Sequence, residues 1–235
     1  MGNRINLSER LKTAASYLPA GAVFADIGSD HAYLPCYICQ KDDQARAVAG
    51  EVRVGPYNSA VSTVKFHGLT NKVDVRLGDG LEVLSPNEVN QIVIAGMGGS
   101  LIQSILQKGI DKLGTVERII AQPNVNARNV RRWLRRNNYM IVDEQIVEEN
   151  GHIYEVLAAD KYAEDPFEEE LLEQQLLFGP ILLEKKPSAF YYKWEHELAK
   201  LERVIDEMKK ASEKNMDKIS QFEMESAWIR EVLGR

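Results

Sequence analysis

Two features are scarce in this chain of 235 residues: cysteine, and apolar runs long enough to cross a bilayer. The two cysteines, Cys36 and Cys39, form a Cys-x-x-Cys pair inside an expected helix instead of directly after a strand, so we interpret them as packing residues and not as a redox pair. One such pair is too few for a zinc site of cysteines alone, and we expect no metal. Because no apolar run spans a bilayer and the N-terminus shows no signal-peptide core, we expect a cytoplasmic protein without membrane contact.

The charge balance gives no general preference for nucleic acid. The formal net charge is −6, and residues 161–235 carry most of it. An acidic chain argues weakly against nucleic-acid binding, although a local basic cluster can reverse that expectation.

Strand and helix patterns alternate five times along residues 1–160. This alternation predicts an α/β fold, with a mostly parallel sheet, helices on both faces and an antiparallel last strand. The hairpin signal Asn150-Gly151 joins the last two strands. The expected strands are residues 23–26, 45–52, 73–77, 91–95, 118–121, 139–148 and 152–159.

Residues 161–235 form a separate segment without strand signals, rich in Glu, Lys and Leu. Apolar residues at alternating steps of four and three predict a coiled-coil helix, and a second apolar series predicts a partner helix that folds back. We therefore expect one domain over residues 1–160 and a helical coiled-coil hairpin over 161–235. The two series are Trp194, Leu198, Leu201, Ile205 and Met208, then Ile219, Phe222 and Ile229.

The first strand ends in the loop Asp26-Ile27-Gly28-Ser29-Asp30, where an α/β sheet binds the polar part of a cofactor. A dinucleotide loop needs three glycines for close approach to a pyrophosphate, and here Ser29 and Ala32 occupy glycine positions. The carboxylate of Asp30 would repel a pyrophosphate, whereas it favours the cationic sulfonium and ammonium groups of S-adenosylmethionine. The loop thus favours S-adenosylmethionine over NAD.

Acids stand at three successive strand ends: Asp26, Glu51 and Asp79, the last followed by Gly80. An acid after the second strand is typical of a ribose partner, and Asp79 suits an adenine amino group. The alternatives that involve no ligand are that Asp26 caps a turn and that Asp79 is a type I turn residue.

A second signal is an arginine-rich helix after Gln122-Pro123-Asn124. Five arginines fall on one helical face that carries no acid, a pattern suited to phosphate backbones, although a solvated helix face is the plain alternative. Two arginines of the N-terminal segment extend the candidate RNA-binding patch. The full set is Arg4, Arg10, Arg128, Arg131, Arg132, Arg135 and Arg136.

The order and spacing of the strand-end motifs over about residues 1–160 resemble those of the bacterial tRNA (adenine-22-N1)-methyltransferase family, and the helical tail is similar to that family's coiled-coil domain. The motifs are residues 26–35, 49–52 with Gly55-Pro56, Gly78-Asp79-Gly80, 95–99 and Gln122-Pro123-Asn124.

The resemblance implies a Rossmann-like class I S-adenosylmethionine-dependent enzyme that methylates N1 of adenine in tRNA. The first loop should shape the methionine end of the cofactor, Glu51 should hold the ribose, and Asp79 should hold the adenine. The cofactor-binding candidates are Asp26, Gly28, Ser29, Asp30, Glu51, Val52, Asp79, Gly80, Gly96 and Met97.

Adenine N1 has a lone pair in the neutral base, so catalysis can consist mostly of alignment. An oxygen near N6 would stabilise the cationic product, and Asp30 and Asn124 are the candidates, with His31 and Tyr33 shaping or stacking the base. A monomer is favoured. The alternatives are methylation of another RNA or a small molecule, a non-catalytic RNA-binding protein, and NAD-linked oxidoreduction.

Overall fold

The computed structural model describes residues 5–234, which divide into two compact units. The first unit runs to Ile181 and the second begins at Leu182. The predicted boundary after residue 160 falls earlier than this division. Residues 161–181 belong to the first unit because Phe167 and Leu176 are buried in its core.

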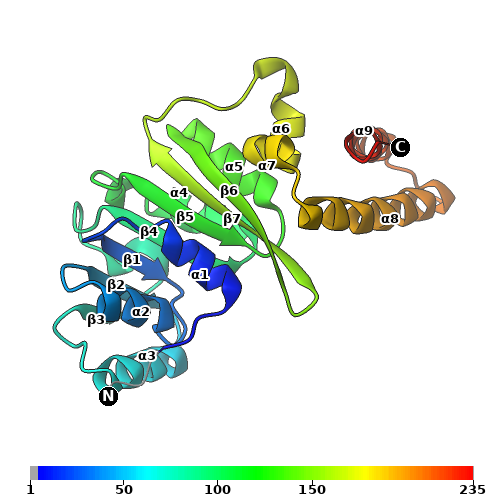
Figure 1. The fold of residues 1–235 in the computed structure, drawn as a ribbon. Helices are drawn as coiled ribbons and strands as arrows, with labels where there is room; N and C mark the ends of the chain where they lie inside the picture. The colour runs from blue at the N-terminus through cyan, green and yellow to red at the C-terminus, as the bar shows by residue number, and fades with distance from the viewer. Residues whose placement is uncertain (1–4, 235) are drawn as a thin grey trace. The chain divides into compact units, whose positions relative to one another are not determined.

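The first unit is built on one seven-stranded sheet in the order β3-β2-β1-β4-β5-β7-β6 (Figure 1). The first five strands are parallel, and β7 is antiparallel to both of its neighbours. The predicted antiparallel last strand is confirmed, and it lies inside the sheet, between β5 and the edge strand β6. The strands are β1 (Val23–Ile27), β2 (Arg46–Glu51), β3 (Val73–Leu77), β4 (Gln91–Met97), β5 (Arg118–Pro123), β6 (Tyr139–Glu149) and β7 (His152–Lys161).

Helices cover both faces of the sheet because alternate strand residues point to opposite sides and both sides are apolar. On β1, Phe24 belongs to one core and Ala25 to the other. The first core lies under α1 (Glu9–Ser16), α2 (Tyr33–Lys41) and α3 (Val54–Phe66), and the second under α4 (Gly99–Lys108), α5 (Ala127–Arg136) and α6 (Leu172–Phe178).

The interpretation of the cysteines as packing residues agrees with their environment. Both Cys36 and Cys39 are buried and carry free thiols, and burial raises the pKa of Cys36 to about 12 and that of Cys39 to about 11. Thiols that stay protonated at neutral pH are poor nucleophiles and poor metal ligands. Within residues 5–234, no cluster of three metal-ligating side chains occurs.

The second unit is a helical hairpin of α8 (Ser188–Lys210) and α9 (Met216–Val232), preceded by α7 (Pro180–Lys185), which spans the division between the units. The predicted apolar residues Leu198, Ile205, Ile219 and Ile229 are buried, and the ion pair between Arg230 and Glu202 joins the two helices at 2.7 Å. Among the described residues, no helix is long and apolar enough to span a membrane.

Candidate functional site

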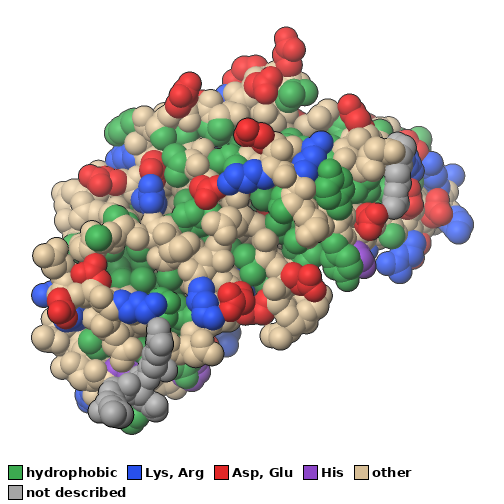
Figure 2. All heavy atoms as spheres, viewed as in Figure 1, with side chains coloured by type: hydrophobic (Ala, Val, Ile, Leu, Met, Phe, Trp, Pro, Cys, Tyr) green, Lys and Arg blue, Asp and Glu red, His purple; other side chains and the backbone are tan. Residues whose placement is uncertain are grey.

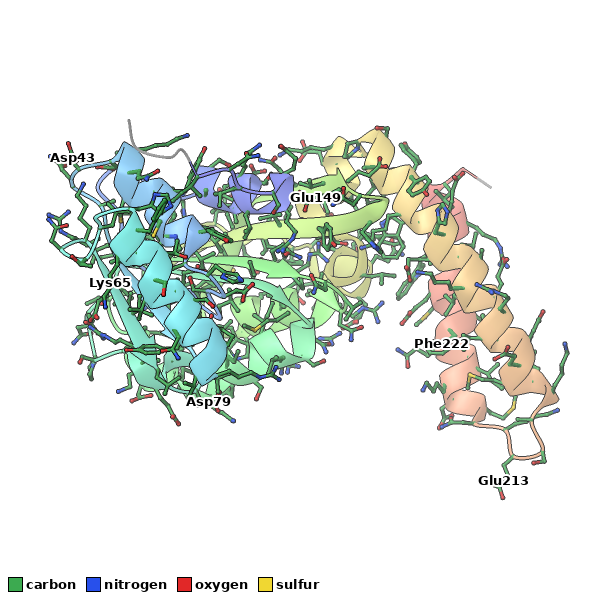
Figure 3. All side chains as sticks on the ribbon, turned by 90° about the horizontal axis from the view of Figure 1, so that it is seen from below. Asp43, Lys65, Asp79, Glu149, Glu213 and Phe222 are labelled. Carbon is green, nitrogen blue, oxygen red and sulfur yellow. The ribbon has the colours of Figure 1, made fainter. Side chains whose placement is uncertain are left out.

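The carboxyl ends of the parallel strands bring the predicted acids to one edge of the sheet. The register pairs Ile27 with Gly50 and Glu51 with Leu77, so β1, β2 and β3 end side by side. Figure 3 shows Asp79 at this edge, far from Asp43, which precedes β2 at the opposite edge. Parallel α/β sheets bind their ligands at this edge.

Asp26 is a buried carboxyl group at the end of β1, only 5% exposed. The hydroxyl of Ser29 donates a hydrogen bond to its Oδ2 at 2.6 Å. Burial raises the pKa of Asp26 to about 7, the Ser29 hydrogen bond opposes that rise, and the charge of Glu51 adds to it. Asp26 is thus held in place by the loop that follows it, and it titrates near neutrality.

The turn after β1 depends on a glycine at position 28. Gly28 has a φ of +72°, and a Cβ on it would lie 2.0 Å from Cε of Met97. The Gly28 and Ser29 amides donate to the carbonyl of Gly50 at 2.9 and 3.2 Å. Any larger residue at position 28 would strain the backbone and displace Met97. The structure thus brings together Gly28, in the turn after β1, and Met97, at the end of β4.

Glu51 ties the first loop to the end of β2. Its Oε1 accepts a hydrogen bond from the amide of Asp30, a residue in the left-handed region with a φ of 57°. Glu51 is 5% exposed, and burial raises the pKa of its carboxyl group. The next residue, Val52, is 61% exposed and presents an apolar surface at the same edge.

Asp79 lies at the start of a short 3-10 turn, and its side chain is largely exposed, 3.7 Å from Nζ of Lys108. A cavity of about 200 Å³ adjoins it, lined by residues 79–82, Ile105, Lys108, Gly109, Asp111 and Lys112. Its lining does not include Asp26 or Glu51, so the cavity borders the strand-end site and is not its centre. Gly80, with a φ of +56°, packs against Ile105.

Asn124, directly after β5, joins that strand to the end of β4. Its Nδ2 donates to the carbonyl of Gly96 at 2.9 Å, and its backbone amide donates to the carbonyl of Met97 at 2.8 Å. Its Oδ1 accepts from Nε2 of Gln122 at 3.1 Å. Asn124 remains exposed, so it is a fixed amide at the surface of the site.

Gln122 is a site residue that the sequence indicated only as part of the motif Gln122-Pro123-Asn124. It is fully buried, and its Oε1 accepts from the Gly96 amide at 3.1 Å and from Nη1 of Arg10 at 2.8 Å. The available signal was a glutamine directly after four residues of a buried strand, where an apolar residue is expected.

His31 and Tyr33 lie together beside the first loop. Their rings stack with centroids 5.2 Å apart and planes 20° apart, and Nε2 of His31 is 3.8 Å from Oδ1 of Asp30. Tyr33 is 44% exposed. This exposed aromatic pair could support a planar ligand by stacking.

The predicted assignment of Arg131 to an RNA-binding face is wrong. Arg131 is 0% exposed, and it contacts Oε1 of Glu144 at 2.6 Å and Oε2 of Glu155 at 2.5 Å. It also donates to the carbonyls of Leu176 and Leu177 at 3.3 Å. Because β6, β7 and the end of α6 enclose its guanidinium, it cannot reach a phosphate.

The arginine face contains no acid from α5 itself, but acids from another segment pair with it. Arg132 pairs with Glu173 at 2.8 Å, and Arg135 pairs with Asp165 at 2.8 Å and Glu169 at 2.5 Å. These acids come from the segment after β7, which sequence reasoning assigned to the other domain. On the face drawn in Figure 2, acidic and basic side chains of the described residues are interspersed.

The remaining predicted arginines occupy different positions. Arg136 is exposed at the end of α5 and Arg128 is partly buried near its start. Arg10 is partly buried beside Gln122, and Arg4 lies outside the described residues. The patch is therefore not one continuous surface.

The raised pKa of Asp26 predicts a pH dependence of stability. Because its folded pKa is about 7 and its usual value 3.8, the protonated native state is favoured, and the associated stability is lost as the pH rises through 7. An Asp26→Asn variant cannot ionise at this position. The difference in unfolding free energy between the variant and wild type should therefore shift in favour of the variant by about 2–3 kcal/mol as the pH rises from 5 to 8. Urea denaturation at both pH values tests this; a constant difference would contradict it.

The fold and this edge together define the class. A sheet ordered 3-2-1-4-5-7-6 with helices on both faces defines a Rossmann-like α/β protein. Acids gather at the carboxyl ends of β1, β2 and β3, where such folds bind their ligands.

Comparison with known proteins identifies the family. A family model described as tRNA (adenine(22)-N(1))-methyltransferase matches residues 24–231. The Bacillus subtilis tRNA (adenine(22)-N(1))-methyltransferase is 43% identical over 98% of both chains. The crystal structure of the B. subtilis M1A22 tRNA methyltransferase matches with a TM-score of 0.90 and 40% identity, over 97% of this chain and 99% of that one. A Streptococcus pneumoniae protein in complex with S-adenosyl-L-methionine matches with a TM-score of 0.85 and 38% identity, over 97% and 100% of the two chains. The protein belongs to the tRNA (adenine(22)-N(1))-methyltransferase family.

Proposed function

We propose that the protein methylates N1 of adenine 22 in tRNA with S-adenosylmethionine as the methyl donor. The observation that carries the proposal is the carboxylate edge of the sheet, which we define as Asp26, Glu51 and Asp79 at the carboxyl ends of β1, β2 and β3. It occurs in a chain that matches the B. subtilis enzyme over nearly its whole length. The cofactor, when bound, supplies an electrophilic methyl group on a sulfonium.

The residues at the edge fit this cofactor. Asp26 and Glu51 are buried carboxyl groups that an ammonium or ribose hydroxyls would satisfy, and the exposed Asp79 can accept from an adenine amino group. Asp30 adds a negative charge that a pyrophosphate would not tolerate. This set of carboxyl acceptors favours a cationic nucleoside over a dinucleotide.

On the acceptor side, the chain supplies position and polarity. Adenine N1 is nucleophilic in the neutral base, so no general base is required. The end of β4, at Gly96–Met97, and Asn124 align the base. Although Oδ1 and Nδ2 of Asn124 each have a protein partner, an amide oxygen has a second lone pair. That lone pair can accept from N6 as the ring becomes cationic, and the His31–Tyr33 pair can stack on a base drawn out of the tRNA.

The proposal is tested by incubating unmodified tRNA with methyl-labelled S-adenosylmethionine and mapping the modified nucleoside. The expected result is 1-methyladenosine at position 22. Methylation at another position, on another RNA or only on small molecules would overturn the assigned acceptor, and no transfer with intact cofactor binding would favour a non-catalytic RNA-binding protein.

Asn124→Ala should lower kcat about 10- to 100-fold, because it removes a fixed oxygen and a loop contact that align the base. Single-turnover kinetics on tRNA measure the loss. The matched control is Asn71→Ala, an exposed asparagine before β3 at the opposite edge of the sheet, which should keep its activity. Normal turnover by Asn124→Ala would remove Asn124 from the catalytic residues.

A further inference from the structure

We propose that Arg10 is a positioning residue of the methyl-transfer site and not a phosphate contact. It acts through Gln122 on Asn124 and on Gly96 and Met97 at the end of β4. This inference rests on the proposed function for the reaction that it serves. The observation is a continuous hydrogen-bond chain that begins on α1 and ends at the exposed amide of Asn124.

The chain has a fixed direction because its first member can only donate. A guanidinium has no acceptor atom, so the group of Gln122 that faces Nη1 of Arg10, 2.8 Å away, must be the amide oxygen Oε1. The Gly96 amide donates to the same oxygen at 3.1 Å. The amide nitrogen of Gln122 therefore faces Asn124.

The orientation of Asn124 follows from that of Gln122. The donor Nε2 lies 3.1 Å from Oδ1 of Asn124, so Nδ2 of Asn124 faces the carbonyl of Gly96 at 2.9 Å. The side chains of Arg10 and Gln122 thus agree with the Gly96 carbonyl on which end of the Asn124 amide is the oxygen. The amide of Gly96 favours the same orientation of Gln122, as does its carbonyl through Asn124, and Arg10 adds a charged donor from a separate element, α1.

The chain also stabilises an irregular part of β4. The pairing of β4 with β5 shifts register between Ala95 and Met97, and Gly96 has a φ of +78°. Both the amide and the carbonyl of Gly96 bind to this side-chain chain. Met97, which covers the turn at Gly28, follows directly.

Arg10 is held by the end of the β6–β7 hairpin. Its Nε lies 3.6 Å from Oε2 of Glu149, and its guanidinium lies 5.6 Å from the ring centre of Tyr154. Oε1 of Glu149 accepts from the Glu9 amide at 2.6 Å, which holds the start of α1 at the same point. Glu149 is labelled in Figure 3. The guanidinium is partly buried, and its donors are engaged by an acid and a buried glutamine of the protein itself.

The test compares Arg10→Ala, Arg10→Lys and Gln122→Glu with Lys12→Ala, which removes an exposed positive charge from the same helix. Arg10→Ala should lower kcat about 10- to 100-fold and leave the KM for tRNA and its salt dependence unchanged within about 2-fold. Arg10→Lys should recover part of kcat because it keeps a donor. Gln122→Glu keeps the acceptor for Arg10 but loses the donor to Asn124, so its kcat should also fall. Lys12→Ala should behave as wild type.

A second readout does not depend on activity. In ¹⁵N-labelled protein without ligand, Arg10→Ala should shift the side-chain amide signals of Gln122 and Asn124, and Lys12→Ala should not. Unchanged amide signals would overturn the inference. The inference would also be overturned if Arg10→Ala kept its kcat, raised the KM for tRNA and reduced the salt dependence of tRNA binding by about one contact. That combination is the signature of a lost phosphate contact. If wild type fails to methylate adenine 22, the proposed function is lost, and the amide signals still decide the role of Arg10.

Discussion

Replacing Arg131 with alanine is expected to lower the free energy of unfolding by about 3–5 kcal/mol, the largest effect on stability predicted for this chain. The variant would leave Glu144 and Glu155, which are 1% and 4% exposed, as buried carboxyl groups without their cation. It would also remove donors from the carbonyls of Leu176 and Leu177. The Arg131–Glu144 pair is also closely packed against Gly179, where an added Cβ would lie 2.5 Å from Oε2 of Glu144.

Chemical denaturation followed by circular dichroism measures this effect, with Arg136→Ala as the matched control. Arg136 is exposed on the same helix, and its replacement should change stability by less than about 0.5 kcal/mol. A combined Arg131→Met, Glu144→Gln and Glu155→Gln variant should recover part of the loss, because it contains no buried charge. A stability of Arg131→Ala within about 1 kcal/mol of wild type would contradict the buried cluster and return Arg131 to the candidate RNA contacts.

The second large effect is expected at Glu51. Glu51→Ala should weaken S-adenosylmethionine binding about 100-fold, because it removes a buried carboxyl acceptor at the predicted ribose position and releases the amide of Asp30. Glu51→Gln keeps an oxygen for that amide but loses the charge, and a smaller loss of about 10-fold is expected.

Titration calorimetry with S-adenosylmethionine and with S-adenosylhomocysteine measures both variants. The control is Glu117→Ala, an exposed glutamate just before β5 at the amino edge of the sheet, which should bind as wild type does. If Glu51→Ala binds both ligands as tightly as wild type, the carboxylate edge is not the cofactor site, and the proposed function loses the observation that carries it.

Most of the sheet could be predicted because each strand is specified locally. An alternating apolar pattern predicted β3 at the residues where it occurs, and short apolar runs predicted strands such as β1 and β4 within one or two residues. The position of β7 inside the sheet could not be predicted in the same way. A hairpin signal specifies that β6 and β7 are paired, but it does not specify which of them binds β5.

The candidate cofactor residues could also be predicted from local pattern, because they lie at the ends of the predicted strands. The partners of the arginines could not be predicted in this way. Five arginines at helical spacing predict a shared face, but spacing contains no information on what packs against that face. The carboxylate partners of Arg131, Arg132 and Arg135 lie 13 to 41 residues away along the chain, on β6, β7 and the segment that follows.

By itself, the sequence determined the α/β fold, the strand-end acids and the loop chemistry that favours a cationic nucleoside. These depend on neighbouring residues, whose burial and turns are set by local pattern and by the common direction of parallel strands. Only the tertiary structure decided that Arg131 is a buried structural cation and that Arg10 lies against Gln122, 112 residues away. The physical reason is that the role of a charged side chain depends on which carboxylates and carbonyls the fold brings within about 3 Å of it, and that choice is made by long-range packing.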